Sequence, residues 1–282
     1  MSAARRALVV PCALFASTGC SGALPLFHGA DTLPKGLVTA GAGVAANLVR
    51  GDAATALRSA QETTVVGVAL RPEDSATYRR GALVAASFAP GLAPWFGARV
   101  GVGWSSDAGL SYTQRSLRVD ARKSFLLTDR VTLSVGAGVM TVLGRRGDGQ
   151  SADLAGLDLS GLRGLGADVP VLVGYQSSAG LVRLYAGLRA GYEVIDGDIA
   201  VGPPSGGDAS GNGGTESGTR VSIEGRRLWG SGILGFALGF RHLFGVAELS
   251  AGAASAKGKV GGGEVSAVGI MVSPGAALVG RF

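Results

Sequence analysis

The stretch Glu264–Phe282, EVSAVGIMVSPGAALVGRF, decides the fold because it alternates between two unlike faces along its whole length. Counting back from Phe282 in steps of two gives an apolar face, formed by Leu278, Ala276, Pro274, Val272, Ile270 and Val268. The intervening positions are mostly small or polar and include Gly269, Ser273, Gly275 and Arg281. A period of two residues is that of a β-strand with one apolar face.

The composition extends this pattern to the whole chain. Glycine accounts for 49 of the 282 residues, which is too many for a helical protein because each glycine destabilises a helix interior by about 1 kcal/mol. The mean hydropathy is +0.33, yet no run of 18 apolar residues occurs and only 16% of the residues are charged. A transmembrane barrel resolves this conflict, because its apolar residues are dispersed at every second position.

A closing strand that ends on Phe282 resembles the insertion signal of bacterial outer-membrane β-barrels. The resemblance is to the broad class of small outer-membrane barrel proteins of Gram-negative bacteria and covers residues 37–282. It implies an all-β fold with a single closed antiparallel barrel of about ten strands, with eight or twelve as alternatives. It also implies outer-membrane lipids and the barrel-assembly machinery as partners. Taken alone, the terminal pattern also fits the last strand of a soluble sheet.

Turn signals divide the chain into ten expected strands: 37–49, 81–89, 95–104, 110–126, 130–145, 168–177, 181–195, 227–241, 246–257 and 264–282. Residues 50–80 form a long connection, with an expected helix at Asp52–Gln61 and a strand at Thr63–Leu70. Long connections (50–80, 146–167 and 196–226) alternate with short turns at Pro90, Thr128, Ala179 and Phe244. Ser105 and Gly258 are expected to belong to the long series. Since outer-membrane barrels have short periplasmic turns, both chain termini are expected in the periplasm.

The first residues have the pattern of a targeting segment. Arg5 and Arg6 precede ten apolar residues, which is the length of a signal-peptide core. The following Ser-Thr-Gly-Cys resembles a bacterial lipobox, which implies cleavage before Cys20 and lipidation of its thiol. Cleavage after Ala23 is the alternative. The expected division is a lipoprotein-type signal peptide (1–19), a periplasmic tether (20–36) and the barrel (37–282).

Cysteine content and charge exclude several functions. Cys12 would leave with the signal peptide and Cys20 would carry lipid, so disulfides and thiolate chemistry are not expected. The formal charge of +6 falls to +4 once Arg5 and Arg6 are removed, leaving 24 basic and 20 acidic residues. No basic run is interleaved with aromatic residues, so we do not expect nucleic-acid binding.

The alternation also predicts which side chains face the lumen. In residues 181–195 one face is apolar and the other holds arginines, and charge facing hydrocarbon costs several kcal/mol. The predicted inward cluster is Arg99, Arg118, Asp120, Arg122, Arg183, Arg189, Glu193 and Glu248. Arg115 and Lys123 fall on the outward face near opposite strand ends, where long side chains reach the headgroups. Trp104 and Tyr192 are expected in aromatic girdles.

Two functions fit this cluster. The arginines and acids form either an ion-paired lumen filling in a structural or docking barrel, or the lining of a narrow, anion-leaning, porin-like pore. The structural barrel would be one part of the cell envelope, for example of a secretion, motility or surface-attachment machine, with other envelope proteins as partners. His28 and His242 are the only histidines, and neither is expected at an outer rim. We therefore expect no enzyme activity, no cofactor and no metal site.

Overall fold

The computed structural model describes residues 25–65, 75–88, 90–113, 116–143, 157–201 and 219–282. Ten strands and two helices follow one another along these residues. In chain order they are β1 (Val38–Arg50), α1 (Asp52–Val65), α2 (Ala76–Phe88), β2 (Gly91–Gly103), β3 (Ser106–Thr113), β4 (Ser116–Thr128), β5 (Val131–Val142), β6 (Leu157–Gln176), β7 (Val182–Val201), β8 (Thr219–Phe240), β9 (Leu243–Val260) and β10 (Gly263–Arg281). The expected signal peptide and Cys20 lie outside the described residues.

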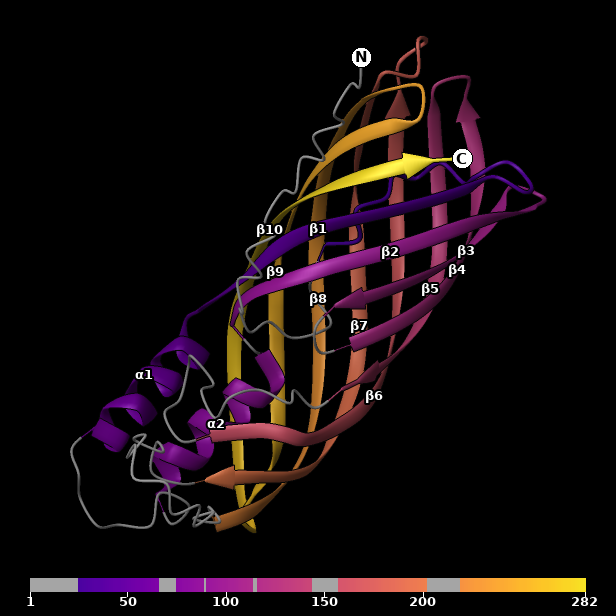
Figure 1. Ribbon diagram of the computed structural model, residues 1–282. Coiled ribbons are helices and arrows are strands. Elements are labelled where there is room, and N and C mark those ends of the chain that lie inside the picture. The colour runs from indigo at the N-terminus through magenta and orange to yellow at the C-terminus, as the bar shows by residue number, and fades with distance from the viewer. Residues whose placement is uncertain (1–24, 66–74, 89, 114–115, 144–156, 202–218) are drawn as a thin grey trace, which may run out of the picture.

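The ten strands close into one antiparallel barrel in which every strand pairs with its neighbours in the chain (Figure 1). β10 returns to β1 and completes the ring, in a register that pairs Thr39 with Arg281. At this seam the amide of Phe282 donates to the carbonyl of Val38 over 2.8 Å, and the amide of Val38 donates to the carbonyl of Phe282 over 3.0 Å. The predicted all-β barrel of about ten strands is therefore confirmed.

One expected strand is a helix. The segment Gly81–Ala89 was expected as the second strand, but its residues up to Phe88 belong to α2 and are all buried. A short run that is apolar on every side cannot be assigned to strand or helix by periodicity alone. The expected helix at Asp52–Gln61 is present as α1. Because α1 continues to Val65, the strand expected from Thr63 does not begin there.

One stretch that was expected to form a single strand forms two strands. The stretch Leu110–Leu126 is divided between β3 and β4, which are paired with each other. Thr113 and Ser116 face each other across the connection, and their hydroxyls hydrogen-bond over 2.8 Å. No Gly, Pro, Asn or Asp lies between them to indicate a turn. This extra strand offsets the strand replaced by α2, so the expected number of ten holds.

The connections separate onto two ends of the barrel. The turn end carries the short connections after β2, β4, β6 and β8, together with Leu37 and Phe282. The helix end carries α1 and α2 together with the last residues of β3, β5, β7 and β9 (Figure 1). The expected alternation of connections is present with two corrections: Ser105 lies at the turn end, and Pro90 ends the long connection that contains both helices.

The strands keep unlike faces, as the sequence predicts. In β7 the outward side chain of Leu188 is 69% exposed, whereas the inward Arg189 is 4% exposed. Trp104 and Tyr192 point outward, the first at the turn end and the second toward the helix end. Lys123 is exposed on the outer face, and Arg115 lies outside the described residues.

Two pieces of the chain occupy the lumen. α2 fills the helix end, where it packs on β8, β9 and β10 and joins an apolar cluster that includes Leu83, Leu162 and Ile223. Residues 25–36, which we call the N-terminal plug, fill the turn end; Leu26 and Phe27 are buried there against Tyr185 and Trp95. Neither α1 nor α2, nor any other helix in the described ranges, is long and apolar enough to cross a membrane.

Candidate functional site

The predicted lumen residues all lie inside the barrel. Seven are buried or nearly so and line the interior on β2, β4, β7 and β9, while Arg183 is half-buried near the turn end. They form two groups, one in the middle of the barrel against the N-terminal plug and one against α2.

Asp168 of β6 links opposite sides of the middle group. Its carboxylate accepts two hydrogen bonds from Arg118, each of 2.8 Å, and a third of 2.8 Å from Arg189. The two-pronged contact with Arg118 is the geometry in which a guanidinium binds a carboxylate most strongly. Asp168 therefore ties β4 to β7 across the intervening strands. It was not among the predicted site residues.

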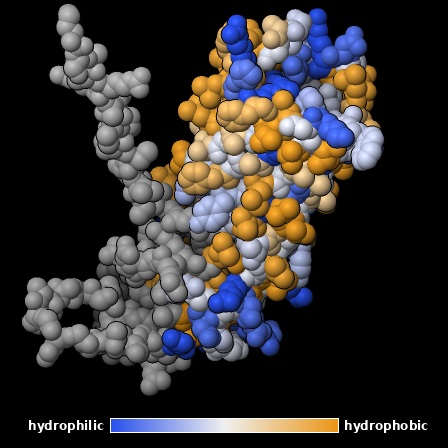
Figure 2. Space-filling view, turned by 45° about the vertical axis from the view of Figure 1, so that its right-hand side comes forward, coloured by the Kyte–Doolittle hydropathy of each residue, from blue (hydrophilic) through white to orange (hydrophobic). Residues whose placement is uncertain are grey.

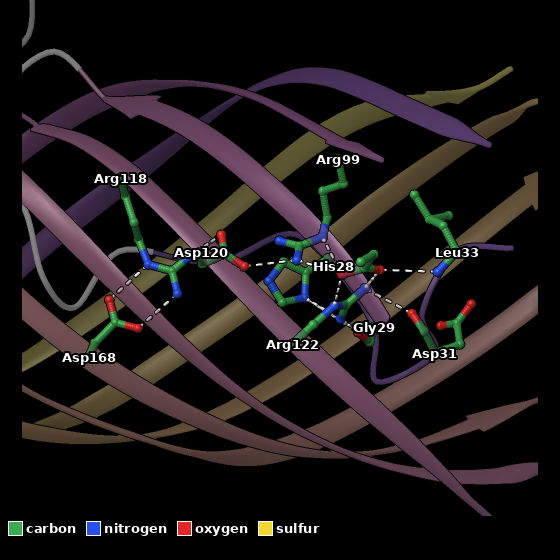
Figure 3. Close-up of polar contacts among 10 residues, drawn as sticks. His28, Gly29, Asp31, Leu33, Arg99, Arg118, Asp120, Arg122 and Asp168 are labelled. Carbon is green, nitrogen blue, oxygen red and sulfur yellow. Dashed lines mark hydrogen bonds and ion pairs between the residues drawn. The ribbon is translucent and has the colours of Figure 1, made fainter. Parts of the chain in front are cut away.

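The ion pairs continue from Arg118 toward the turn end (Figure 3). Arg118 contacts Asp120 over 2.6 Å, and Asp120 contacts Arg99 over 2.8 Å. Arg99 and Arg122 then share Asp107, at 2.7 Å and 2.8 Å. Positive and negative groups alternate along the whole chain of contacts, so each buried charge has an opposite charge beside it, as a buried charge requires.

Nearer the turn end, Arg122 and Asp107 of this group bind backbone atoms of the N-terminal plug. Arg122 donates to the carbonyl of Gly29, and to the carbonyl of Asp31 over 2.8 Å. The amide of Leu33 donates to Asp107 over 3.1 Å. On the same face, the ring nitrogen Nδ1 of His28 lies 2.7 Å from a guanidinium nitrogen of Arg122 (Figure 3).

Side chains of other strands contact the start of the N-terminal plug. Glu248 accepts hydrogen bonds from the amides of Leu26 and Phe27, over 2.7 and 2.8 Å, and from the hydroxyl of Tyr185 over 2.6 Å. Phe27 also packs edge-on against Trp95, with 5.0 Å between the ring centres.

Sequence reasoning expected residues 20–36 to be a tether in the periplasm. The structure instead places the described part, from residue 25, within the barrel. Lumen carboxylates and a guanidinium bind its main-chain amides and carbonyls, and such groups are present in any sequence. The only sequence signal is a weak one, the apolar pair Leu26 and Phe27 in a segment expected to be exposed.

The second group closes the lumen against α2. Glu193 accepts from Arg227 over 2.6 Å and from the indole nitrogen of Trp229 over 3.1 Å. Arg227 also donates to the carbonyl of Ser87, in the last turn of α2. A cation at this position satisfies a helix-terminal carbonyl and the negative end of the helix dipole. Arg227 therefore fixes α2 to the barrel wall, and sequence reasoning did not select it.

The lumen charges nearly balance. The inward arginines with ionic partners are matched in number by carboxylates: Arg99, Arg118, Arg122, Arg183, Arg189 and Arg227 against Asp31, Asp107, Asp120, Asp168, Glu193 and Glu248. Arg281 is half-buried near the turn end and adds one further positive charge. The expected positive field of facing arginines is thus largely cancelled by acids. One cavity lined by described residues, beside the N-terminal plug, measures about 80 Å³.

Each of the two histidines has a polar contact with a neighbouring residue. Burial, together with the nearby positive charges of Arg122 and Arg99, lowers the pKa of His28 well below its usual range. His28 is therefore neutral at neutral pH and accepts from Arg122. His242 is exposed at the turn end, with Nδ1 2.9 Å from the carbonyl of Arg281. Within the described ranges, no group of three His, Cys, Asp or Glu residues is placed to hold a metal ion.

Comparison with solved structures finds an outer membrane protein and a channel, both at low similarity. A major outer membrane protein from Thermus thermophilus is 12% identical, covers 87% of this chain and 99% of its own, and gives a TM-score of 0.33. The CymD monoaromatic hydrocarbon channel is 8% identical, covers 89% of each chain and gives a TM-score of 0.29. The sequence matches no protein-family model and no curated protein. The strand pairing of this chain itself therefore carries the fold assignment.

Proposed function

We propose that this chain is a bacterial outer-membrane barrel with a closed lumen, which serves the cell envelope as a structural or docking component and not as an enzyme. The observation that carries the proposal is the occupation of the lumen from both ends, by α2 and by the N-terminal plug. Ten strands enclose more space than side chains alone fill, since eight already leave an interior that side chains just fill. Here two segments of the chain occupy that space.

The outer surface supports a membrane location. The outward residues of β8 are apolar or glycine from Leu228 to Phe240 and charged or polar from Arg220 to Arg226. At about 3.3 Å per residue and a tilt of about 40°, the apolar stretch spans roughly 30 Å along the barrel axis, which is the thickness of a bilayer core. Figure 2 shows hydrophobic residues concentrated along the middle of the barrel and hydrophilic residues toward both ends.

The proposed orientation follows from the connections. Short turns face the periplasm in outer-membrane barrels, so the turn end with Phe282 would be periplasmic and the helix end would face outward. An epitope inserted in residues 202–218 should then be labelled on intact cells, whereas one inserted after Ala179 should be labelled only after the outer membrane is opened. The reverse labelling pattern would invert the orientation.

Conductance decides between this proposal and the narrow pore. Purified protein, shown to be folded by the heat-dependent change in its gel mobility, should be silent in planar bilayers because two segments and paired charges fill the lumen. Discrete conductance steps with anion preference would contradict the closed barrel. If Arg183→Gln and Arg189→Gln weakened that preference, the pore would be the correct function.

A further inference from the structure

The outer surface of the barrel carries a pair of cations where its apolar band ends at the helix end. Arg226 of β8 and Lys257 of β9 are directly paired in the strand register, and both side chains are exposed on the outer face. Cross-strand neighbours have Cβ atoms about 5 Å apart, and like charges in this arrangement destabilise a sheet. Neither residue forms an ion pair within the described ranges.

The register shows which residues flank this pair. Val194 of β7 is paired with Arg226 on one side, and Ser266 of β10 is paired with Lys257 on the other, so no carboxylate lies level with the two cations. Arg80 of α2 donates to the carbonyl of Ser266 over 2.9 Å, but its own charge is matched by Asp52 at 2.5 Å.

The neighbouring rows differ in chemistry. The row nearer the middle of the barrel consists of Tyr192, Leu228, Ser255 and Val268, which are mostly apolar. The row nearer the loops consists of Asp196, Glu224, Lys259 and Glu264. There Lys259 has a carboxylate on each side, because Glu224 and Glu264 are its register partners. The acids of this region are therefore grouped around Lys259, one row beyond Arg226 and Lys257.

These rows line an open hollow of about 930 Å³ on the outside of the barrel. Its lining includes Tyr192 and Val194 toward the apolar band, then both cations, and then Lys259 with its neighbouring acids Asp196, Glu224 and Glu264 toward the loops. The hollow thus has apolar residues at the depth of lipid chains, the Arg226–Lys257 pair at the depth of headgroups, and the acids one row farther from the hydrocarbon.

We propose that Arg226 and Lys257 bind the phosphate of an anionic lipid headgroup in the outer leaflet. This proposal rests on the membrane location proposed above. A phosphate between the two cations would offset their mutual repulsion, and guanidinium and ammonium groups are the side chains that bind phosphate. Basic groups at the edge of the hydrocarbon are the general means by which membrane proteins recognise anionic headgroups.

The test uses the purified, folded full-length protein in detergent micelles, with phosphatidic acid and phosphatidylcholine as probes. Native mass spectrometry should detect preferential binding of phosphatidic acid. The double substitution Arg226→Gln with Lys257→Gln should weaken that binding about 30-fold, since each cation near a lipid surface contributes about a factor of five. The matched control, Lys123→Gln with Arg130→Gln, removes two exposed positive charges at the turn end and should leave the binding unchanged.

Three results would overturn the proposal: unchanged binding in the Arg226/Lys257 variant, an equal loss in the control variant, or complete displacement of the lipid by an equal concentration of inorganic phosphate. The last would show a site for the free anion and not for a lipid. Insertion into phosphatidylcholine vesicles is measured on the same preparation. Failure to insert would contradict the membrane location itself, whereas insertion without lipid preference would contradict only the headgroup site.

Discussion

Replacing Asp168 with Asn should produce the largest loss of stability among conservative changes in the lumen. The substitution keeps the shape of the side chain and removes its charge. Three charge-assisted hydrogen bonds of 2.8 Å end on this carboxylate, two from Arg118 and one from Arg189. The amide nitrogen of Asn would itself be a donor facing a guanidinium, so at least one of these bonds would be replaced by repulsion.

The magnitude follows from burial. The side chain of Asp168 is fully buried, and those of Arg118 and Arg189 are 7% and 4% exposed. Removing one partner of a buried ion pair costs about 3–5 kcal/mol, because the remaining charge is left without compensation. Arg118 keeps Asp120, which places the expected loss nearer 3 kcal/mol. This corresponds to a decrease of roughly a hundredfold in the equilibrium constant for folding.

Urea unfolding of the refolded barrel in lipid vesicles, followed by the shift in gel mobility, measures this loss. The matched control is Asp52→Asn, which removes the carboxylate from the 2.5 Å contact with Arg80, where the side chains are 48% and 40% exposed. An exposed pair of this kind contributes at most about 1 kcal/mol. If Asp168→Asn were no more destabilising than Asp52→Asn, the ion-pair chain could not be what holds β4 and β7 together.

Three further predictions concern the ends of the chain. Burial and nearby arginines lower the pKa of His28 in the folded state, so its neutral form stabilises the docked N-terminal plug above the ordinary pKa of about 6.5. Below that pH the stabilisation decreases by up to about 1.4 kcal/mol per pH unit. Protease cleavage within residues 25–36 should therefore increase at acidic pH in the wild type, and a similar increase in His28→Gln would exclude His28 as the cause. Deleting Phe282 should reduce the heat-modifiable protein in the outer membrane, because its amide and carbonyl close the seam with Val38; normal assembly would remove the support for its role as an insertion signal. Cys20→Ala should abolish labelling with palmitate, and a wild type that takes up no label would show that the lipoprotein assignment is wrong.

The strands with clear alternation could be predicted from sequence. In β7 and β10 the apolar and polar faces are separated residue by residue, and the structure places each face as expected. The inward charges of β4 and β7 follow from the same rule, since a barrel in lipid must turn charge inward. Only the period of two is needed for these assignments.

What sequence reasoning missed depends on contacts between distant segments. Asp107 lies in Ser105–Gly109, which the sequence predicts as a turn, so it was not assigned to the lumen. Nothing in the sequence marks the connection between β3 and β4, across which inward and outward positions exchange. α2 lies inside the lumen, where its residues Gly81–Phe88 are all buried. An apolar run in the sequence does not show whether a lumen will surround it. The N-terminal plug is held largely through its backbone, so its sequence offers only the weak signal of the apolar pair Leu26 and Phe27.

The depth of the N-terminal plug in the lumen limits how a lipid on Cys20 could reach the membrane. Gly36 is at the turn end, bonded to Gly101, whereas Pro25 lies beside Gly275, roughly 15 Å deeper along the axis. Cleavage before Cys20 leaves five residues ahead of Pro25, which reach at most about 17 Å and can just return a lipid to the turn-end leaflet. Cleavage after Ala23 leaves one. If the predicted cleavage before Cys20 occurs, the depth of Pro25 therefore requires nearly the full reach of residues 20–24 to anchor a lipid at the turn end.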